Sequence, residues 1–227
     1  MKNENRKAVN TLGDTQILKE DRLFIQSWLD AYFDSPHRDI LMSLPAKMDE
    51  NDAGVPVEMQ DGEVDEEGWV RWRMLDSAVT VEQIDELVDA LIRPRSDACG
   101  AAFSVPPLYA AYLSTRYVLN VYLRYDGCTI ALPNLPSDSP LEEIRKLWSS
   151  WPTLIEAGYI PFASYEDGAG PVCWETNKPD QEQDYAVVWF DHESLFDEQQ
   201  HSREKLEQHA QPLFSSFRAM LMQSASR

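Results

Sequence analysis

Apolar side chains recur at intervals of three or four residues along several stretches of this chain, which is the spacing of an amphipathic helix. Residues 16–34 form the first such stretch, and the residue before Pro36 avoids helical geometry, so this helix is expected to end there. Its apolar face carries Leu18, Ile25, Leu29 and Tyr32. Such a face must be covered by another part of the protein, so we expect the helix to pack against a main domain.

Further helices are predicted where capping residues precede an apolar stripe. Thr80 and Gln83 occupy the two positions of a capping box, and Ser139 and Glu142 repeat that pattern. Pro106-Pro107 predicts another helix start, because proline is tolerated in the first helical turn. These patterns indicate three helices in the middle of the chain.

Stretches rich in β-branched and aromatic residues predict strands between these helices. Turn-forming residues separate them, and Asp126-Gly127 is a hairpin signal. The chain is expected to end in a helix from about residue 203, which Pro212 should kink or split. The expected strands are residues 120–125, 128–132, 158–163, 171–176 and 185–191.

Sequential strands joined by short connections predict an α+β fold, with a mostly antiparallel sheet and helices packed on one side. We expect an N-terminal helical extension over residues 1–68, a main domain over residues 69–223 and a short tail over residues 224–227. The extension holds the helix at 16–34 and a loop at 48–67. That loop contains nine acidic residues and neither lysine nor arginine, so self-repulsion favours its exposure.

The formal net charge of the chain is −19 at pH 7, with 39 acidic residues against 20 basic ones. Such a surface repels nucleic acid and anionic membranes, so neither is expected as a partner. An acidic surface favours solubility, and it also steers association with a basic partner. Composition alone leaves both interpretations open.

Cysteine usage and the lack of long apolar runs bear on the compartment. Cys99, Cys128 and Cys173 are widely spaced and odd in number, which is typical of reduced thiols. No Cys-x-x-Cys pair suggests a zinc site. The sequence has no run of about 18 apolar residues and no apolar leader after Met1. We therefore expect a cytoplasmic protein without a metal or a cofactor.

Three motifs follow one another in the second half of the chain: Val105–Leu113, with the sequence VPPLYAAYL; Tyr159–Trp174, which contains IPFA, DGAG and CW; and Trp189–Glu193, with the sequence WFDHE. In this order they resemble the core of the SUKH superfamily, also called the Smi/Knr-type domain. The resemblance covers about residues 69–223. It departs from the family where Trp174 follows Cys173, and residues 1–68 match no part of the family.

The resemblance implies a protein-binding domain, and many bacterial members of the superfamily are immunity proteins against toxins. Together with the acidity, it predicts an immunity protein that blocks a cognate, basic, nuclease-like toxin by direct contact. Carboxylates would imitate the phosphate charge that the toxin binds, and aromatic anchors would supply affinity. The predicted contacts are Glu166, Asp167, Asp184, Asp191 and Glu193, with Tyr165 and Trp174 as anchors. No catalytic, cofactor-binding or metal-binding residue is assigned.

Two other functions stay open. One is a regulatory scaffold that binds cellular signalling or cell-wall-synthesis proteins, as the resemblance to eukaryotic SUKH members implies. The other is a carboxylate-dependent hydrolase built on Asp191, His192 and Glu193. Adjacent residues of a strand point to opposite faces, so a strand could not make all three side chains converge. The identity of the toxin and the oligomeric state are left open.

Overall fold

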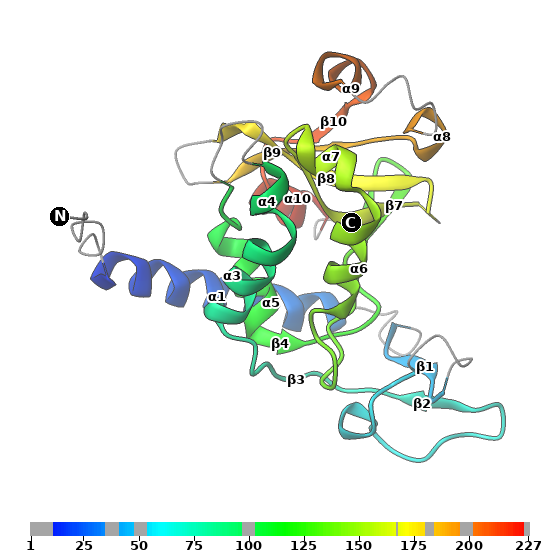
Figure 1. Ribbon diagram of the computed structural model, residues 1–227. Helices are drawn as coiled ribbons and strands as arrows, with labels where there is room; N and C mark the ends of the chain where they lie inside the picture. Colours follow the sequence, from blue (N-terminus) through cyan, green and yellow to red (C-terminus); the bar gives the residue numbers. More distant parts are fainter. Residues whose placement is uncertain are drawn as a thin grey trace.

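A curled antiparallel sheet of six strands, with the main helical layer on one side, forms the centre of this α+β protein (Figure 1). The computed structural model describes residues 11–34, 41–47, 54–96, 103–166, 168–179, 184–195 and 202–224. In spatial order the strands are β10 (Gln211–Phe214), β9 (Tyr185–Trp189), β8 (Gly170–Pro179), β7 (Tyr159–Tyr165), β6 (Cys128–Ala131) and β5 (Tyr122–Tyr125). The predicted fold class and the five predicted strands are confirmed.

The two faces of the sheet bury different sets of residues. Along β8, Val172 and Trp174 belong to the main core, whereas Cys173 between them belongs to a smaller apolar cluster. This alternation follows from the two-residue period of a strand. Leu154 and Leu206 contribute to the smaller cluster from α7 (Pro152–Glu156) and α9 (Arg203–His209). The central strands are therefore covered on both faces.

Local sequence signals account for several element boundaries. Asp126 and Gly127 have φ angles of 49° and 84°, as a tight hairpin turn between β5 and β6 requires. Thr80 and Gln83 form both hydrogen bonds of the predicted capping box at the start of α3 (Val81–Leu91). The second predicted capping box is wrong: the Ser139 hydroxyl bonds to the Asp138 side chain, and α6 (Glu142–Ser150) starts without a side-chain cap.

The C-terminal region is not the single helix that the apolar spacing predicts. It forms α9, then β10, and then α10 (Phe217–Ser224). Pro212 lies inside β10, opposite Val188 of β9. Proline is tolerated there because β10 is an edge strand, whose outer N–H groups need no partner in the sheet. Pairing with β9 therefore decided the local conformation, although the apolar residues on either side of Pro212 have the spacing of a helix.

The N-terminal helix α1 (Thr11–Phe33) packs on α5 (Pro107–Thr115), and Ile25 and Leu29 of its apolar stripe lie in the main core. Two contacts also tie it to α10. The Trp28 indole nitrogen donates to the Leu221 carbonyl oxygen at 3.2 Å, and Arg218 pairs with Asp21 at 2.7 Å. Two further short helices of the described residues are α4 (Arg93–Ser96) and α8 (His192–Leu195). The expectation that α1 packs against the main domain is confirmed.

A small projecting unit, here called the arm, comprises residues 41–47 and 54–73 (Figure 1). Within it β1 (Ser43–Pro45) pairs with β2 (Trp69–Arg71), and a 3-10 helix (Val57–Met59) closes the loop between them. The predicted boundary between residues 68 and 69 therefore falls inside a two-stranded sheet. Another short pair, β3 (Leu75–Asp76) with β4 (Arg116–Tyr117), follows the arm.

Trp72 joins the arm to the main core. Its side chain is fully buried, and its ring meets the Phe33 ring of α1 edge to face, with 5.2 Å between the ring centroids. The Trp72 indole nitrogen donates to the Leu41 carbonyl oxygen at 3.0 Å. The period of two along β2 leaves Trp69 and Arg71 exposed on the other side.

Candidate partner-binding surface

Two aromatic side chains stack at one corner of the sheet, across a strand that lies between them. Tyr165 of β7 lies opposite Gly170 of β8, and Val172 of β8 lies opposite Trp189 of β9. The Tyr165 and Trp189 ring centroids are 4.2 Å apart, with an angle of 15° between the ring planes. Both rings are partly exposed. They offer a flat aromatic surface held by three paired strands.

The turn between β7 and β8 depends on unusual backbone angles. Glu166 and Gly168 both have positive φ, at 48° and 85°. A Cβ atom on Gly170 would lie 1.8 Å from the Phe190 carbonyl oxygen, so only glycine fits there. The Gly-x-Gly pattern of the sequence therefore serves a tight turn and a close approach of backbones.

Glu166 is bonded back to the neighbouring strand. Its backbone N–H donates to the Thr129 carbonyl oxygen at 2.7 Å, and its carboxylate accepts from the Thr129 N–H at 2.8 Å. The side chain remains exposed to solvent. The carboxylate is thus an exposed negative group with a fixed position beside Tyr165.

The sequence suggests that Asp191, His192 and Glu193 end strand β9, but β9 ends at Trp189. Asp191 precedes α8, and His192 and Glu193 form its first residues. The Asp191 carboxylate accepts from the Glu193 N–H at 2.9 Å, as a residue preceding a helix commonly does. Both the His192 N–H and its Nδ1 atom contact the Ala169 carbonyl oxygen, at 2.8 and 2.7 Å. These bonds hold α8 against the β7–β8 turn.

The hydrogen bonds of the His192 ring and the Asp191 carboxylate go to backbone groups. His192 Nδ1 uses its hydrogen bond on a backbone carbonyl, and the nearest Asp191 carboxylate oxygen is 4.0 Å away. Neither pocket described below includes Asp191, His192 or Glu193 in its lining. Among the described residues, no group of three or more His, Cys, Asp or Glu side chains is arranged to hold a metal ion.

We call the set Tyr165, Glu166, Trp189, Asp191 and Glu193 the aromatic corner. It unites four of the seven predicted contact residues, because the β7–β8 turn is bonded to the start of α8. Trp189 is the member that the sequence did not assign, although its place in the WFDHE motif was visible. Aromatic groups bordered by charged ones are typical of protein-recognition surfaces.

Two predicted contacts lie inside the protein, which corrects their assignment. Trp174 is fully buried and stacks on Phe162 at 4.2 Å between ring centroids, because its side chain points to the main core from a central strand. Asp184 is buried as well, and its carboxylate accepts from the Tyr185 and Phe217 N–H groups at 2.8 and 3.0 Å. It caps α10. The remaining prediction, Asp167, lies outside the described residues.

The surroundings of Tyr165 favour its neutral phenol. Burial raises the pKa of Tyr165 to about 12, and a hydrogen bond with the Cys128 thiol adds to this effect. The negative charges of Glu166 and Asp126 raise the pKa further. At neutral pH the ring is therefore an uncharged contact surface among acidic groups.

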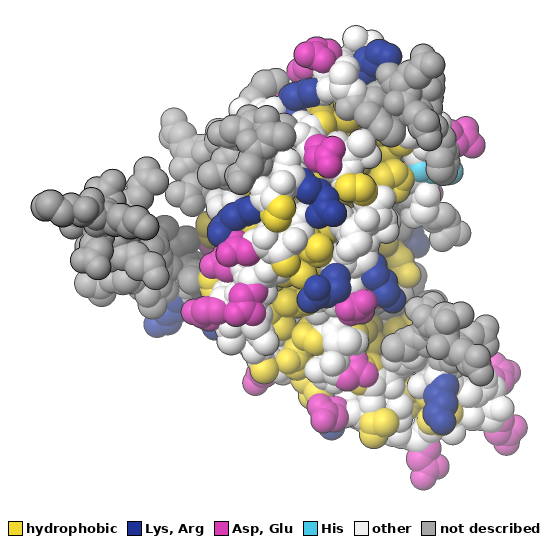
Figure 2. Space-filling view, in the orientation of Figure 1, with side chains coloured by type: hydrophobic (Ala, Val, Ile, Leu, Met, Phe, Trp, Pro, Cys, Tyr) yellow, Lys and Arg dark blue, Asp and Glu magenta, His cyan; other side chains and the backbone are white. Residues whose placement is uncertain are grey.

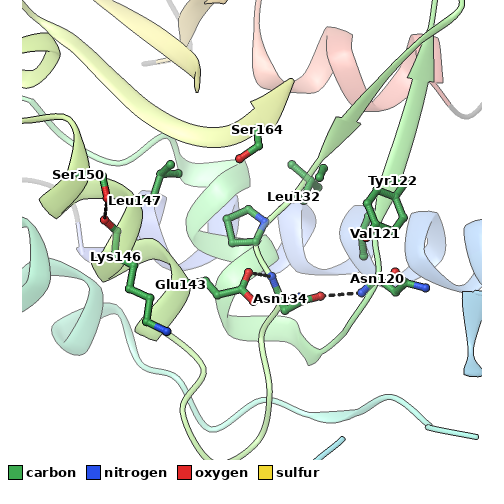
Figure 3. A pocket seen from close by; sticks show the side chains of 12 residues that line it. Asn120, Val121, Tyr122, Leu132, Asn134, Glu143, Lys146, Leu147, Ser150 and Ser164 are labelled. Atoms are coloured by element: carbon green, nitrogen blue, oxygen red, sulfur yellow. Dashed lines mark hydrogen bonds between the residues drawn. The ribbon is translucent and has the colours of Figure 1, made fainter. Parts of the chain in front are cut away.

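A pocket of about 320 Å³ opens where β6 and β7 separate (Figure 3). The two strands pair only at Ile130 with Tyr165 and at Ala131 with Ser164. Along its polar side, the Glu143 carboxylate accepts from the Asn134 backbone and side-chain nitrogens at 2.6 and 2.9 Å.

The Asn134 side-chain oxygen in turn accepts from the Asn120 N–H at 2.7 Å. Figure 3 shows Glu143, Asn134 and Asn120 in a row. Their hydrogen bonds satisfy one another, so the row stabilises the loop in which Asn120 adopts a φ of 62°. The residues are distant in sequence, and no motif predicted this pocket.

Comparison of the chain with models of known protein families gives no match, and comparison with curated protein sequences gives none either. Within the described residues, no helix combines the length and apolarity needed to cross a membrane.

Proposed function

We propose that this chain is an immunity-type protein that neutralises a basic, nuclease-like toxin domain by direct contact. The observation that carries the proposal is the partly exposed stack of Tyr165 on Trp189, with the exposed Glu166 beside Tyr165. Asp191 and Glu193 follow Trp189 at the start of α8. The motifs that resemble the SUKH superfamily include these residues. No covalent step is required, because occupation of the toxin's active site is enough to block it.

The two kinds of side chain have separate tasks. The carboxylates, together with the formal net charge of −19, attract a basic surface and raise the association rate. The aromatic rings lose water on contact and slow dissociation, as aromatic anchors do in other interfaces. The carboxylates take the place of the phosphate groups that a nuclease binds.

The aromatic corner is held rigid before any partner binds. Tyr165 and Trp189 lie on hydrogen-bonded strands, and the Glu166 carboxylate and the start of α8 are bonded to the backbone. A surface that is already ordered loses little conformational entropy on binding. Tight binding therefore needs only a modest area.

The proposed compartment is the cytoplasm. Cys128 and Cys173 carry free thiols, and Cys173 is buried, which raises its pKa and lowers its reactivity. Free thiols of this kind persist in a reducing compartment. A toxin that enters the same compartment would meet the protein there.

The test is co-expression with the toxin domain encoded beside this gene, scored by growth. Rescue together with a stoichiometric complex that weakens in salt is the expected result. Tyr165→Ala should reduce rescue, and Glu166→Gln with Glu193→Gln should slow association roughly tenfold or more at low salt. Both amide substitutions keep an oxygen acceptor.

A matched control removes two charges elsewhere. Asp85 and Glu86 are exposed on α3, so Asp85→Asn with Glu86→Gln changes the net charge equally away from the aromatic corner. If both double variants slowed association equally, the overall net charge would explain the effect, and a specific binding surface would be contradicted. Failure of the unchanged chain to restore growth, together with no complex, would reject the immunity function itself.

A further inference from the structure

A second pocket, of about 410 Å³, lies where the last turn of α1 meets the base of the arm. Its walls are apolar: Phe33 and Met42 are buried, and Met74 is partly buried. The exposed side chains of Asp30 and Asp34 complete the lining. The pocket thus joins an apolar interior to two carboxylates that face solvent.

The two carboxylates stand in an unfavourable place. Asp30 lies in the last turn of α1, and Asp34 directly follows the helix, four residues on, a spacing at which like charges repel. Both lie at the C-terminal end of α1, the negative end of the helix dipole, and the last turn contains no basic residue. Across the described ranges, neither Asp30 nor Asp34 has a side-chain hydrogen bond or an ion pair, even though Arg73 is next to Met74.

We propose that this pocket docks a lysine or arginine side chain of a basic partner protein. The methylene stem would lie on Phe33, Met42 and Met74, since long cationic side chains bury their stems on apolar surface. The cationic head would lie between Asp30 and Asp34 and relieve their mutual repulsion. The apolar walls fit the stem, and the uncompensated charge at the rim fits the head.

The arm extends the same surface chemistry away from the pocket. Its six described acidic residues are all exposed, and Figure 2 shows carboxylates at its outer end. Trp69, 41% exposed, lies on β2 among them, and Val64, 47% exposed, lies in the loop that precedes β2. A basic partner held in the pocket would therefore meet apolar and acidic groups along the arm. This inference concerns a surface separate from the aromatic corner and does not depend on the partner being a toxin.

Methyl NMR on the full chain, labelled with ¹³C at the methionine methyl groups, tests the proposal. The Met42 and Met74 signals are assigned through Met→Leu variants, and the protein is titrated with hexa-arginine amide. We expect saturable shifts of these two signals, and roughly fivefold weaker binding in Asp30→Asn with Asp34→Asn. Asp85→Asn with Glu86→Gln is again the matched control, with binding unchanged.

The double asparagine variant is expected to fold, because the substitution removes repulsion at the helix end. Urea unfolding should show equal or higher stability. The proposal would be overturned if the peptide shifted the signals of other methionines but not those of Met42 and Met74. It would also be overturned if the peptide affinity fell equally in both double variants. Spermidine that binds as tightly as the peptide would overturn the assignment to a protein side chain and indicate a free polyamine. None of these outcomes depends on rescue by a toxin.

Discussion

Tyr125 and Phe214 lie on the two outermost strands of the six-stranded sheet, yet their ring centroids are only 4.4 Å apart. Tyr125 ends β5, and Phe214 ends β10. A flat sheet would separate these strands by about 24 Å, the sum of five gaps of about 4.8 Å. The sheet therefore curls until side chains on its two edge strands touch.

The aromatic contact between the two edges should contribute strongly to stability. Phe214 is buried, so Phe214→Ala should lower the free energy of unfolding by about 3 kcal/mol. Urea unfolding followed by circular dichroism measures this loss. Tyr125→Phe, which keeps the ring, should change the free energy by less than about 0.5 kcal/mol. If Phe214→Ala were as stable as the unchanged chain, the contact between the two edge strands would contribute nothing to the free energy of unfolding.

Asp184 should prove structural, although the sequence suggests a partner contact. Its carboxylate caps α10 at the Phe217 N–H from 33 residues away in the chain. Asp184→Ala should therefore cost about 1–2 kcal/mol of unfolding free energy, and Asp184→Asn less, because the amide keeps one acceptor oxygen. Chemical unfolding measures both. A variant of full stability that fails to bind its partner would restore Asp184 as a contact.

Two glycines in one turn should respond differently to alanine. A Cβ at Gly170 meets the Phe190 carbonyl oxygen, so Gly170→Ala should cost at least about 2 kcal/mol and disturb the aromatic corner. Gly168 has open space around it, and its φ of 85° should make Gly168→Ala cost only about 1 kcal/mol. Thermal unfolding compares the two. Similar costs would show that the close approach of backbones is unimportant.

The tyrosines should ionise in two groups. Burial raises the pKa of Tyr159 and of Tyr165 to about 12, and it raises the pKa of Tyr109 and Tyr112 as well. In the unfolded chain these phenols ionise near pH 10. The folded protein therefore binds these protons more tightly, and its stability falls as the pH rises from about 10 to about 12. Below pH 10 this contribution is fully present.

Absorbance at 295 nm during an alkaline titration follows the phenolates directly. Of the nine tyrosines, those four should ionise late or only as the chain unfolds, together with Tyr32, whose pKa burial also raises. Tyr165→Phe should remove one late-ionising group while the others remain. Ionisation of all nine near pH 10 in a folded protein would contradict the burial of these rings.

Local sequence signals determined the elements that depend on neighbouring residues. The Asp126-Gly127 hairpin, the Thr80 cap and the proline start of α5 each rest on backbone preferences within a few residues. The two-residue period along β8 likewise determined which face of the sheet each side chain lies on. The α+β class followed from the order of these elements, because short connections favour antiparallel pairing.

Tertiary structure decided what the sequence pattern left open or misassigned. The spacing near Pro212 is helical, but pairing with β9 made a strand of it, and nothing local encodes that partner. Trp174 and Asp184 looked like surface residues because aromatic and acidic residues surround them in sequence, while their burial depends on α5 and α10. The stack of Tyr165 on Trp189 likewise joins positions 24 residues apart. Contacts across the sheet, which no short window contains, created both the curled core and the candidate surface.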